Sequence, residues 1–269
     1  MTRAGAASNA APVLEVFASI QGEGAFIGEP QVFLRLRGCP LRCRWCDTPG
    51  SWKLAEGQHA RIDSARGGSR REPAWATPFQ AACWVAECEP GSPRTISVTG
   101  GEPLLWPDFV LGLRAMVGQR RIHLETGGAH PKSLALVVDA VDHVSLDLKP
   151  DQDLDAPEEV VGAGAEERAP RTSLEWRAAR RASLALVEGR DACGKIVVSG
   201  ERALTDFAAL LDEVEDVAPR LRVILTPATP IAGVKAPTME LVLAVAELAR
   251  DRDLDVRVVP QVHRLLQLP

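Results

Sequence analysis

Three cysteines lie close together in the segment GCPLRCRWCDT, at Cys39, Cys43 and Cys46. Their C-x3-C-x2-C spacing puts three thiols in one loop, and clustered thiols in a chain of this length bind metal more often than they form disulfides. Three thiolates on a four-iron cluster leave one iron without a protein ligand, where a small molecule with an amine and a carboxylate can chelate. The triplet therefore predicts a [4Fe-4S] cluster with an open iron, which is a catalytic arrangement.

Two simpler interpretations of the triplet stay open when the residues are taken alone. A structural zinc site needs a fourth ligand, which would have to be a distant residue such as Cys83, Cys88 or His59. The three thiols could also be unrelated buried side chains, because short cysteine motifs occur by chance. The remaining cysteines, including Cys193, fit no second cluster spacing and are expected to be buried small apolar residues.

The elements that must position this loop are predicted from short β-branched or Leu-rich runs that alternate with longer helical patterns. The expected strands are Val32 to Gly38, Thr95 to Gly100, Arg121 to Thr126, His143 to Lys149, Lys195 to Ser199, Arg222 to Pro227 and Asp255 to Pro260. The expected helices are Pro78 to Glu87, Pro107 to Val117, Pro131 to Val138, Ser173 to Val187, Leu204 to Val217 and Pro237 to Arg250. This α/β pattern fits an open doubly wound sheet or an incomplete β/α barrel, and in both the chemistry gathers at the carboxyl ends of the strands.

Composition limits the partners. The 269 residues carry 31 Lys and Arg against 36 Asp and Glu, so the formal net charge is −5 and no strong positive field favours nucleic acid. No uncharged apolar run is long enough for a membrane span, and MTRAGAASNAAP lacks the features of a signal peptide. We therefore expect a cytoplasmic single domain over 1–269, with a flexible tail at 1–12 and surface insertions at 56–72 and 151–171.

Two marks resemble the radical S-adenosylmethionine (SAM) superfamily. One is the cysteine loop with an aromatic residue, Trp45, just before the third cysteine, and the other is TGGEP at Thr99 to Pro103. The resemblance implies a partial TIM-like barrel whose [4Fe-4S] cluster donates an electron to SAM and releases a 5′-deoxyadenosyl radical. The two glycines would let the backbone approach a ligand closely.

A narrower resemblance covers nearly the whole chain. The segment VFASIQGEGAFIGEPQVFLRLRGCPLRCRWCDT, followed by SVTGGEP, HLETGG, DLKP and PQVHR, is similar to the 7-carboxy-7-deazaguanine synthases (the QueE family). The resemblance implies a lyase that contracts the ring of 6-carboxy-5,6,7,8-tetrahydropterin to 7-carboxy-7-deazaguanine with loss of ammonia, on the route to deazapurines such as queuosine. The radical would remove a hydrogen from C6 of the substrate.

The same resemblance assigns roles to residues of this chain. Substrate contacts are expected from Ile20, Gln21, Gly22, Glu23, Arg35, Thr99, His263 and the terminal Pro269. Gln21 and its neighbours would read the donor and acceptor edge of the pterin, and the Arg35 guanidinium would bind the substrate carboxylate. Cluster and SAM contacts are expected from Trp45, Cys46, Asp47, Gly101, Glu102, Glu125, Thr126, Asp147, Leu148, Lys149, Thr226, Pro227, Ala228 and Thr229. Thr48 offers a hydroxyl oxygen suited to Mg²⁺, which the family uses.

The resemblance also implies a flavodoxin-like or ferredoxin-like electron donor and a homodimer. One departure is ETGG, where the family commonly has ETNG, so Gly128 lacks an amide side chain. The nearest rival function is an activase that makes a glycyl radical on a partner protein, and a second is a zinc-binding interaction module without catalysis. QGEG, Arg35 and PQVHR argue against the activase, and metal analysis of anaerobically purified protein would separate the zinc module.

Overall fold

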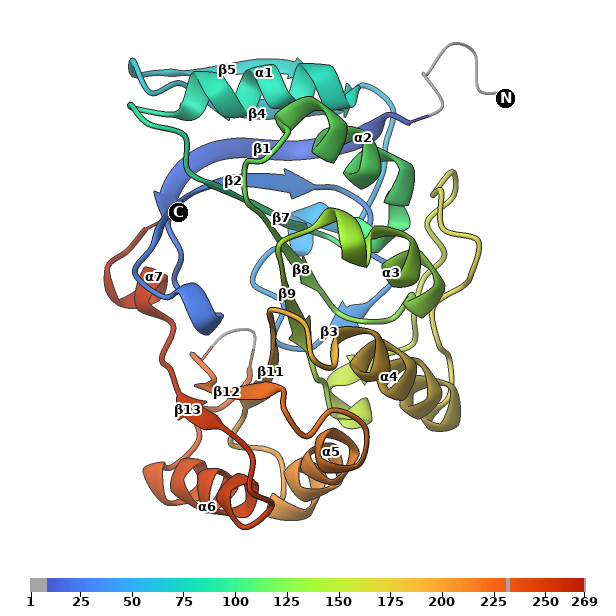
Figure 1. The fold of residues 1–269 in the computed structure, drawn as a ribbon, viewed down its shortest axis with the longest axis vertical. Coiled ribbons are helices and arrows are strands. Elements are labelled where there is room, and N and C mark those ends of the chain that lie inside the picture. Colours follow the sequence, from blue (N-terminus) through green and yellow to red (C-terminus); the bar gives the residue numbers. More distant parts are fainter. Residues whose placement is uncertain (1–8, 231–232, 269) are drawn as a thin grey trace.

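Seven parallel strands form the centre of the protein in a computed structural model that describes residues 9–230 and 233–268 (Figure 1). They are β2 (Pro30–Leu36), β7 (Thr95–Gly100), β8 (Ile122–Thr126), β9 (His143–Asp147), β11 (Ala192–Val198), β12 (Arg222–Pro227) and β13 (Val256–Val258). Each pairs in parallel with the next in this order. The seven predicted strands are confirmed, with ends shifted by a few residues.

Helices cover the outside of this curved sheet, as Figure 1 shows. They are α1 (Pro78–Cys88), α2 (Pro107–Val117), α3 (Pro131–Val137), α4 (Ser173–Val187), α5 (Leu204–Val217) and α6 (Met239–Arg250). Thr77 and Thr172 begin α1 and α4 with capping boxes, and Thr238 caps α6, which begins two residues later than predicted.

The strand order decides between the two architectures that the sequence left open. A doubly wound sheet reverses direction at a switch point, whereas here the parallel strands follow one another in chain order. Every crossover therefore turns the same way, the helices stay on one side, and the sheet curves as in a barrel. β13 pairs with β12 alone among the described strands, so the barrel is incomplete.

The other edge of the sheet carries elements that the sequence did not predict. β1 (Ala11–Ile20) lies antiparallel to β2, and the hairpin of β4 (His59–Asp63) and β5 (Ser69–Pro73) extends the sheet beyond it. β6 (Trp75–Ala76) pairs with the start of β1. The expected insertion at 56–72 is thus part of the sheet. The tail expected at 1–12 is too long, because Ala11 is fully buried in β1; residues 1–8 lie outside the described residues.

The second expected insertion, 151–171, is attached to the cysteine loop. Its strand β10 (Leu154–Asp155) pairs with β3 (Arg42–Cys43), which lies within that loop. The backbone amide of Arg44 also donates to the carbonyl of Asp153 at 3.0 Å. Residues 151–158 therefore form a clasp on the cysteine loop.

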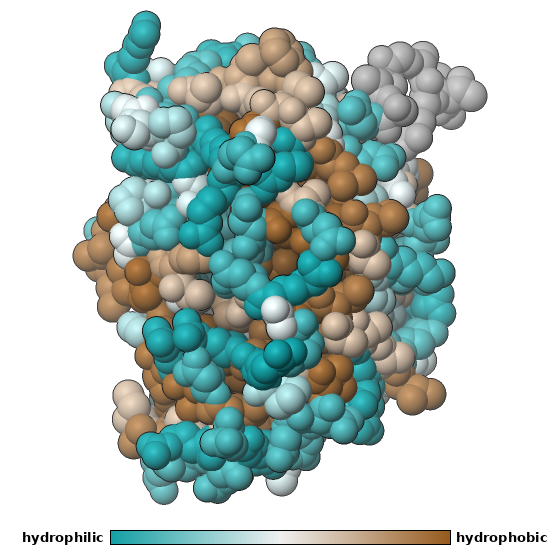
Figure 2. Space-filling view, in the orientation of Figure 1, coloured by the Kyte–Doolittle hydropathy of each residue, from teal (hydrophilic) through white to brown (hydrophobic). Residues whose placement is uncertain are grey.

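The core lies between the sheet and the helices. Strand residues such as Leu34, Ile96, Ile122 and Leu124 are fully buried there with helix residues such as Phe109 and Phe207. On the side drawn in Figure 2, the described residues form a patchwork of hydrophilic and hydrophobic side chains. None of the helices within 9–230 and 233–268 is long and apolar enough to span a membrane.

Candidate active site

A cavity of about 560 Å³ opens at the carboxyl ends of the parallel strands. Nearly all the expected site residues line it: Ile20, Gln21, Gly22, Glu23, Arg35, Cys39, Cys43, Trp45, Cys46, Asp47, Thr48, Thr99, Gly101, Glu102, Glu125, Thr126, Asp147, Lys149, Thr226, Ala228, Thr229 and His263. Two do not: the Leu148 side chain is buried in the core, and Pro227 pairs with Val198 at the end of β12. Pro269 lies outside the described residues.

The three cysteines of the loop all reach the cavity, and all are free thiols. Burial raises the pKa of each thiol, to about 12 for Cys43 and well above the ordinary value for Cys39. The thiols are therefore neutral in the protein alone, and metal binding must displace their protons. This donor set suits a cationic iron–sulfur cluster core.

The arrangement disfavours a single zinc ion. Thiolates that share one zinc lie about 4 Å apart, given Zn–S bonds of about 2.3 Å. Among the described residues, the only three potential ligands whose donor atoms lie within 4.8 Å of one another are Glu23, Asp47 and His263, and none is a cysteine. The proposed fourth ligands do not line the cavity either.

The remaining cysteines divide differently from the prediction. Cys88 and Cys193 are buried, as expected, but Cys83 is exposed on α1. A thiol is small and weakly polar, so a surface helix tolerates it.

Arg42 holds the cysteine loop in shape. Its Nη1 donates to the carbonyls of Cys39 and Leu41, both at 2.8 Å, and its Nη2 lies 2.7 Å from Glu158 in the clasp. The guanidinium also lies 4.8 Å above the Trp52 ring. Arg42 thus satisfies two buried carbonyls and links the loop to the clasp.

The TGGEP segment packs directly on the loop. A Cβ on Gly101 would lie 2.1 Å from the carbonyl oxygen of Gly38, so only glycine fits. The Glu102 amide donates to that same carbonyl at 2.8 Å. The Glu102 carboxylate accepts from the Thr126 hydroxyl at 2.6 Å and from the Gly127 amide at 2.9 Å, which ties the end of β7 to the end of β8.

Lys195, which sequence reasoning missed, stands at the centre of the charged groups. Its Nζ lies 3.1 Å from Asp147, 3.3 Å from Glu125 and 3.5 Å from Glu23. Burial would lower the pKa of Lys195, but these three carboxylates raise it well above its ordinary value. Asp147 in turn accepts from Lys149 at 2.6 Å. One ammonium group thus joins carboxylates from three separate elements.

Glu125 is linked to the residues expected to bind substrate. Its Oε1 accepts from Gln21 Nε2 at 3.0 Å and from Ser97 Oγ at 2.8 Å. Burial would raise the pKa of Glu125, but Lys195, His123 and these hydrogen bonds lower it to about 2. The carboxylate is therefore ionised and accepts only, next to an amide that can both donate and accept.

The C-terminal segment covers the open side of the cavity, beside the turn after β1. The short helix α7 (Val262–Leu265) begins where the Val262 amide donates to the Gly22 carbonyl at 3.0 Å, and Gln261 donates to Glu23 at 2.6 Å. Arg264 and Leu268 also line the cavity. The described residues of this segment therefore fold back onto the cavity, while Pro269 lies outside the described residues.

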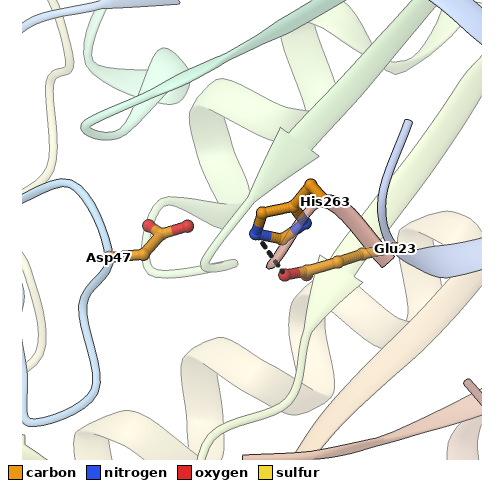
Figure 3. A group of neighbouring side chains, drawn as sticks. All are labelled: Glu23, Asp47 and His263. Atoms are coloured by element: carbon orange, nitrogen blue, oxygen red, sulfur yellow. Dashed lines mark ion pairs between the residues drawn. The ribbon is translucent and has the colours of Figure 1, made fainter. Parts of the chain in front are cut away.

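Three potential metal ligands converge at this place. Figure 3 shows the side chains of Glu23, Asp47 and His263 directed toward one another, from the turn after β1, the cysteine loop and α7. Thr48 donates to Asp47 at 2.8 Å, which places its hydroxyl next to the group. Oxygen ligands of this kind suit Mg²⁺.

Two residues at the ends of β12 and β8, Thr226 and Gly128, bear on what the cavity can bind. The buried Thr226 hydroxyl lines the cavity and has no hydrogen-bond partner among the described residues, which fits a bound cofactor. Gly128, at the ETGG departure, has a φ of +68°, and a Cβ there would lie 2.6 Å from Leu146. A side chain at position 128 would therefore start against Leu146 and Ser183, and Gly128 itself does not line the cavity.

Comparisons with known proteins agree with this site. The model of the radical SAM superfamily matches residues 34–167. A 7-carboxy-7-deazaguanine synthase from Methanothermobacter thermautotrophicus is 30% identical, over 96% of this chain and 98% of its own. One from Geobacter sulfurreducens is 31% identical, over 94% and 95%.

Solved structures show the same fold. QueE from Escherichia coli superposes with a TM-score of 0.53 at 20% identity, over 93% of both chains. A radical SAM methyltransferase from Sphaerobacter thermophilus gives a TM-score of 0.53 at 17% identity, over 86% of this chain and 66% of its own. Because full-length relatives reach 30% identity and the cysteine loop lines the cavity at the barrel's mouth, the chain belongs to the 7-carboxy-7-deazaguanine synthase family of the radical SAM superfamily.

Proposed function

We propose that the chain is a radical SAM carbon–nitrogen lyase that converts 6-carboxy-5,6,7,8-tetrahydropterin to 7-carboxy-7-deazaguanine and releases ammonia. The observation that carries this proposal is that one cavity contains both the three-cysteine loop and the polar set of Gln21, Glu23 and Glu125. The identity with full-length synthases favours the lyase over a glycyl-radical activase. One sheet runs through the chain, which supports a single domain.

Cys39, Cys43 and Cys46 would hold the [4Fe-4S] cluster. When bound, the cluster supplies the electron that cleaves SAM to a 5′-deoxyadenosyl radical. The backbone at Gly101, the Thr226 hydroxyl and Lys149, whose ammonium lies 5.1 Å above the Trp45 ring, would contact SAM. The cavity walls orient the reactants and exclude water.

The substrate would be read by its hydrogen-bonding edge and by its carboxylate. Glu125 was expected to contact SAM, but its hydrogen bond from Gln21 supports a role at the substrate instead. Ionised Glu125 would accept from ring N–H groups, and Gln21 would supply the complementary donor and acceptor. Arg35, which lines the cavity beside Thr99, would bind the carboxylate. The short C-terminal helix would cover the bound substrate.

We propose Mg²⁺ at Thr48, supported by the nearby oxygens of Asp47 and Glu23. We also propose a flavodoxin-like or ferredoxin-like reductant, a homodimer and a cytoplasmic location, as the resemblance implies.

The direct test is an anaerobic assay with reconstituted protein, SAM, reductant, Mg²⁺ and the carboxytetrahydropterin. We expect 7-carboxy-7-deazaguanine and 5′-deoxyadenosine together, and neither from Cys46→Ala. If the wild-type protein forms 5′-deoxyadenosine without the deazapurine, the proposed substrate is wrong and only the radical SAM chemistry stands. About four irons per chain are expected, against one zinc for a zinc module.

A further inference from the structure

A row of directly paired residues crosses the sheet from the cavity to its outer edge. Thr99 on β7 pairs with Arg35 on β2, Arg35 with Glu15 on β1, Glu15 with Arg61 on β4, and Arg61 with Arg71 on β5. Residues opposite one another on neighbouring strands point to the same face of a sheet. We call these five residues the cross-strand row.

Glu15 stands between two guanidinium groups of this row. Its Oε1 lies 2.7 Å from Arg35 Nη1, and its Oε2 lies 2.8 Å from Arg61 Nη2. The Glu15 and Arg35 side chains are only 15% and 20% exposed, whereas Arg61 is 46% exposed. The pair next to the cavity is therefore more shielded from solvent, and its Coulomb interactions are stronger there.

Arg35 is held in place by its neighbours but keeps free hydrogen-bond donors. Its guanidinium lies 5.3 Å from the centre of the Phe17 ring, which stacks on Phe33 at 5.2 Å. Glu15 occupies Nη1, and no described residue accepts a hydrogen bond from Nη2 or Nε. A second carboxylate can therefore bind the free donors.

The β4–β5 hairpin supplies positive charge, from Arg61 and Arg71, that lets Arg35 still attract a carboxylate. Paired with Glu15 alone, Arg35 would be neutralised and would attract a carboxylate weakly. The row contributes three guanidinium groups against one carboxylate, that of Glu15. Outside the row, Asp63 lies 3.3 Å from Arg61, and Arg37 interacts electrostatically with Glu15. Positive charge is therefore in excess around Glu15, which favours a bound anion at Arg35.

We propose that Glu15 and Arg61 are positioning residues for carboxylate recognition: Glu15 fixes the guanidinium of Arg35, and Arg61 neutralises Glu15. This inference rests on the proposed function, in which Arg35 binds the substrate carboxylate. It gives the β4–β5 hairpin a part in substrate selection.

The test compares a carboxylated with an uncarboxylated ligand on the reconstituted, SAM-bound enzyme. Dissociation constants for 7-carboxy-7-deazaguanine and 7-deazaguanine are measured by calorimetry for the wild type, Arg61→Met and Arg61→Lys. Arg66→Met is the matched control, because Arg66 is exposed in the turn of the same hairpin. We expect Arg61→Met to weaken the carboxylated ligand by about 3- to 5-fold, as for a half-exposed ion pair, and to leave the other unchanged. Arg61→Lys should restore most of the affinity.

Glu15→Gln tests the fixing role separately. The guanidinium loses an anchor and a neutralising neighbour, so we expect the carboxylated substrate to bind at least as tightly, with KM unchanged or lower. We expect kcat to fall and more 5′-deoxyadenosine to form per deazapurine, because the guanidinium is no longer held in one position. If Arg61→Met weakened the binding of both ligands equally, Arg61 would have a structural role alone and the inference would be overturned. Unchanged affinity for both ligands would overturn it as well. If wild type prefers the carboxylated ligand through Arg35 but Arg61→Met keeps that preference, the inference fails and the proposed function stands. If wild type has no such preference, the proposed function itself fails.

Discussion

Lys195 holds together three carboxylates of the site, those of Glu23, Glu125 and Asp147. It is largely buried and faces three carboxylates from different elements, so its charge is compensated only by the folded structure. Removing one partner of a buried charged group leaves the others without compensation, which costs about 3–5 kcal/mol.

We therefore expect Lys195→Met to lower the free energy of unfolding strongly at neutral pH, whereas Lys132→Met, at an exposed position, should change it little. Thermal unfolding measures both. Equal melting temperatures for the two variants would contradict the role given to Lys195.

The same substitution has a signature in pH. The pKa of Glu125 is about 2 in the folded protein, below the value of about 4.3 in an unfolded chain. Glu125 therefore adds stability above the unfolded pKa, and this contribution is lost as the pH falls from about 4.3 to about 2. Without Lys195 the folded pKa rises, so acid unfolding should begin at a higher pH in Lys195→Met. Melting temperatures between pH 7 and pH 3 test this.

Gly101 gives a second prediction at the residue scale. A methyl group there meets the backbone of Gly38, next to the first cysteine, and the loop must shift. We expect Gly101→Ala to cost about 1–3 kcal/mol of stability and to lower the iron content after reconstitution. Gly91→Ala is the control, because nothing lies within 4 Å of its added Cβ. Iron analysis and circular dichroism separate loss of the site from loss of the fold.

At the scale of elements, the clasp of residues 151–158 is what the cysteine loop depends on. It adds a strand to the loop and an acidic partner to Arg42. Arg42→Met leaves two carbonyls without a donor, at about 1–3 kcal/mol for a buried group. We expect this variant to lose its brown cluster absorbance faster in air than Arg44→Met, which removes an exposed charge from the same loop. Equal rates would mean that the clasp does not protect the cluster.

Elements also show where sequence reasoning succeeds. Parallel strands are buried on both faces, so they read as apolar runs such as TISVTG and RVILTP. β1 was not predicted because Glu15 interrupts its apolar pattern, and Glu15 is tolerated there, largely shielded from solvent, because Arg35 and Arg61 flank it. The strand β5, SRREP, reads as a loop because an edge strand carries charges.

The residues of the site also divide into those that the sequence could predict and those that it could not. The cysteines and glycines were predictable because local spacing and backbone geometry fix their roles. Lys195 was not, because it begins an ordinary run, KIVVS, and its three partners lie far away in the chain. Only the barrel brings their charges together.

At the scale of the whole molecule, the cavity is completed by two segments from opposite regions of the chain, the turn after β1 and the residues that follow β13. A variant that stops after Pro260 lacks Gln261, His263 and the helix that covers the cavity. We expect it to keep the cluster and cleave SAM, but to release 5′-deoxyadenosine with little deazapurine. The ratio of the two products checks this, and a wild-type ratio would show that α7 is dispensable.

This closure also sets an order of events during synthesis. Glu23 and Gln261 are separated by 238 residues, so at about 5–20 residues per second the ribosome makes one roughly 10–50 s before the other. The nascent chain thus presents its thiols long before the residues that shield them have been translated. The cavity is therefore completed by the last residues to be translated, after the thiols and the strands that position them are already in the chain.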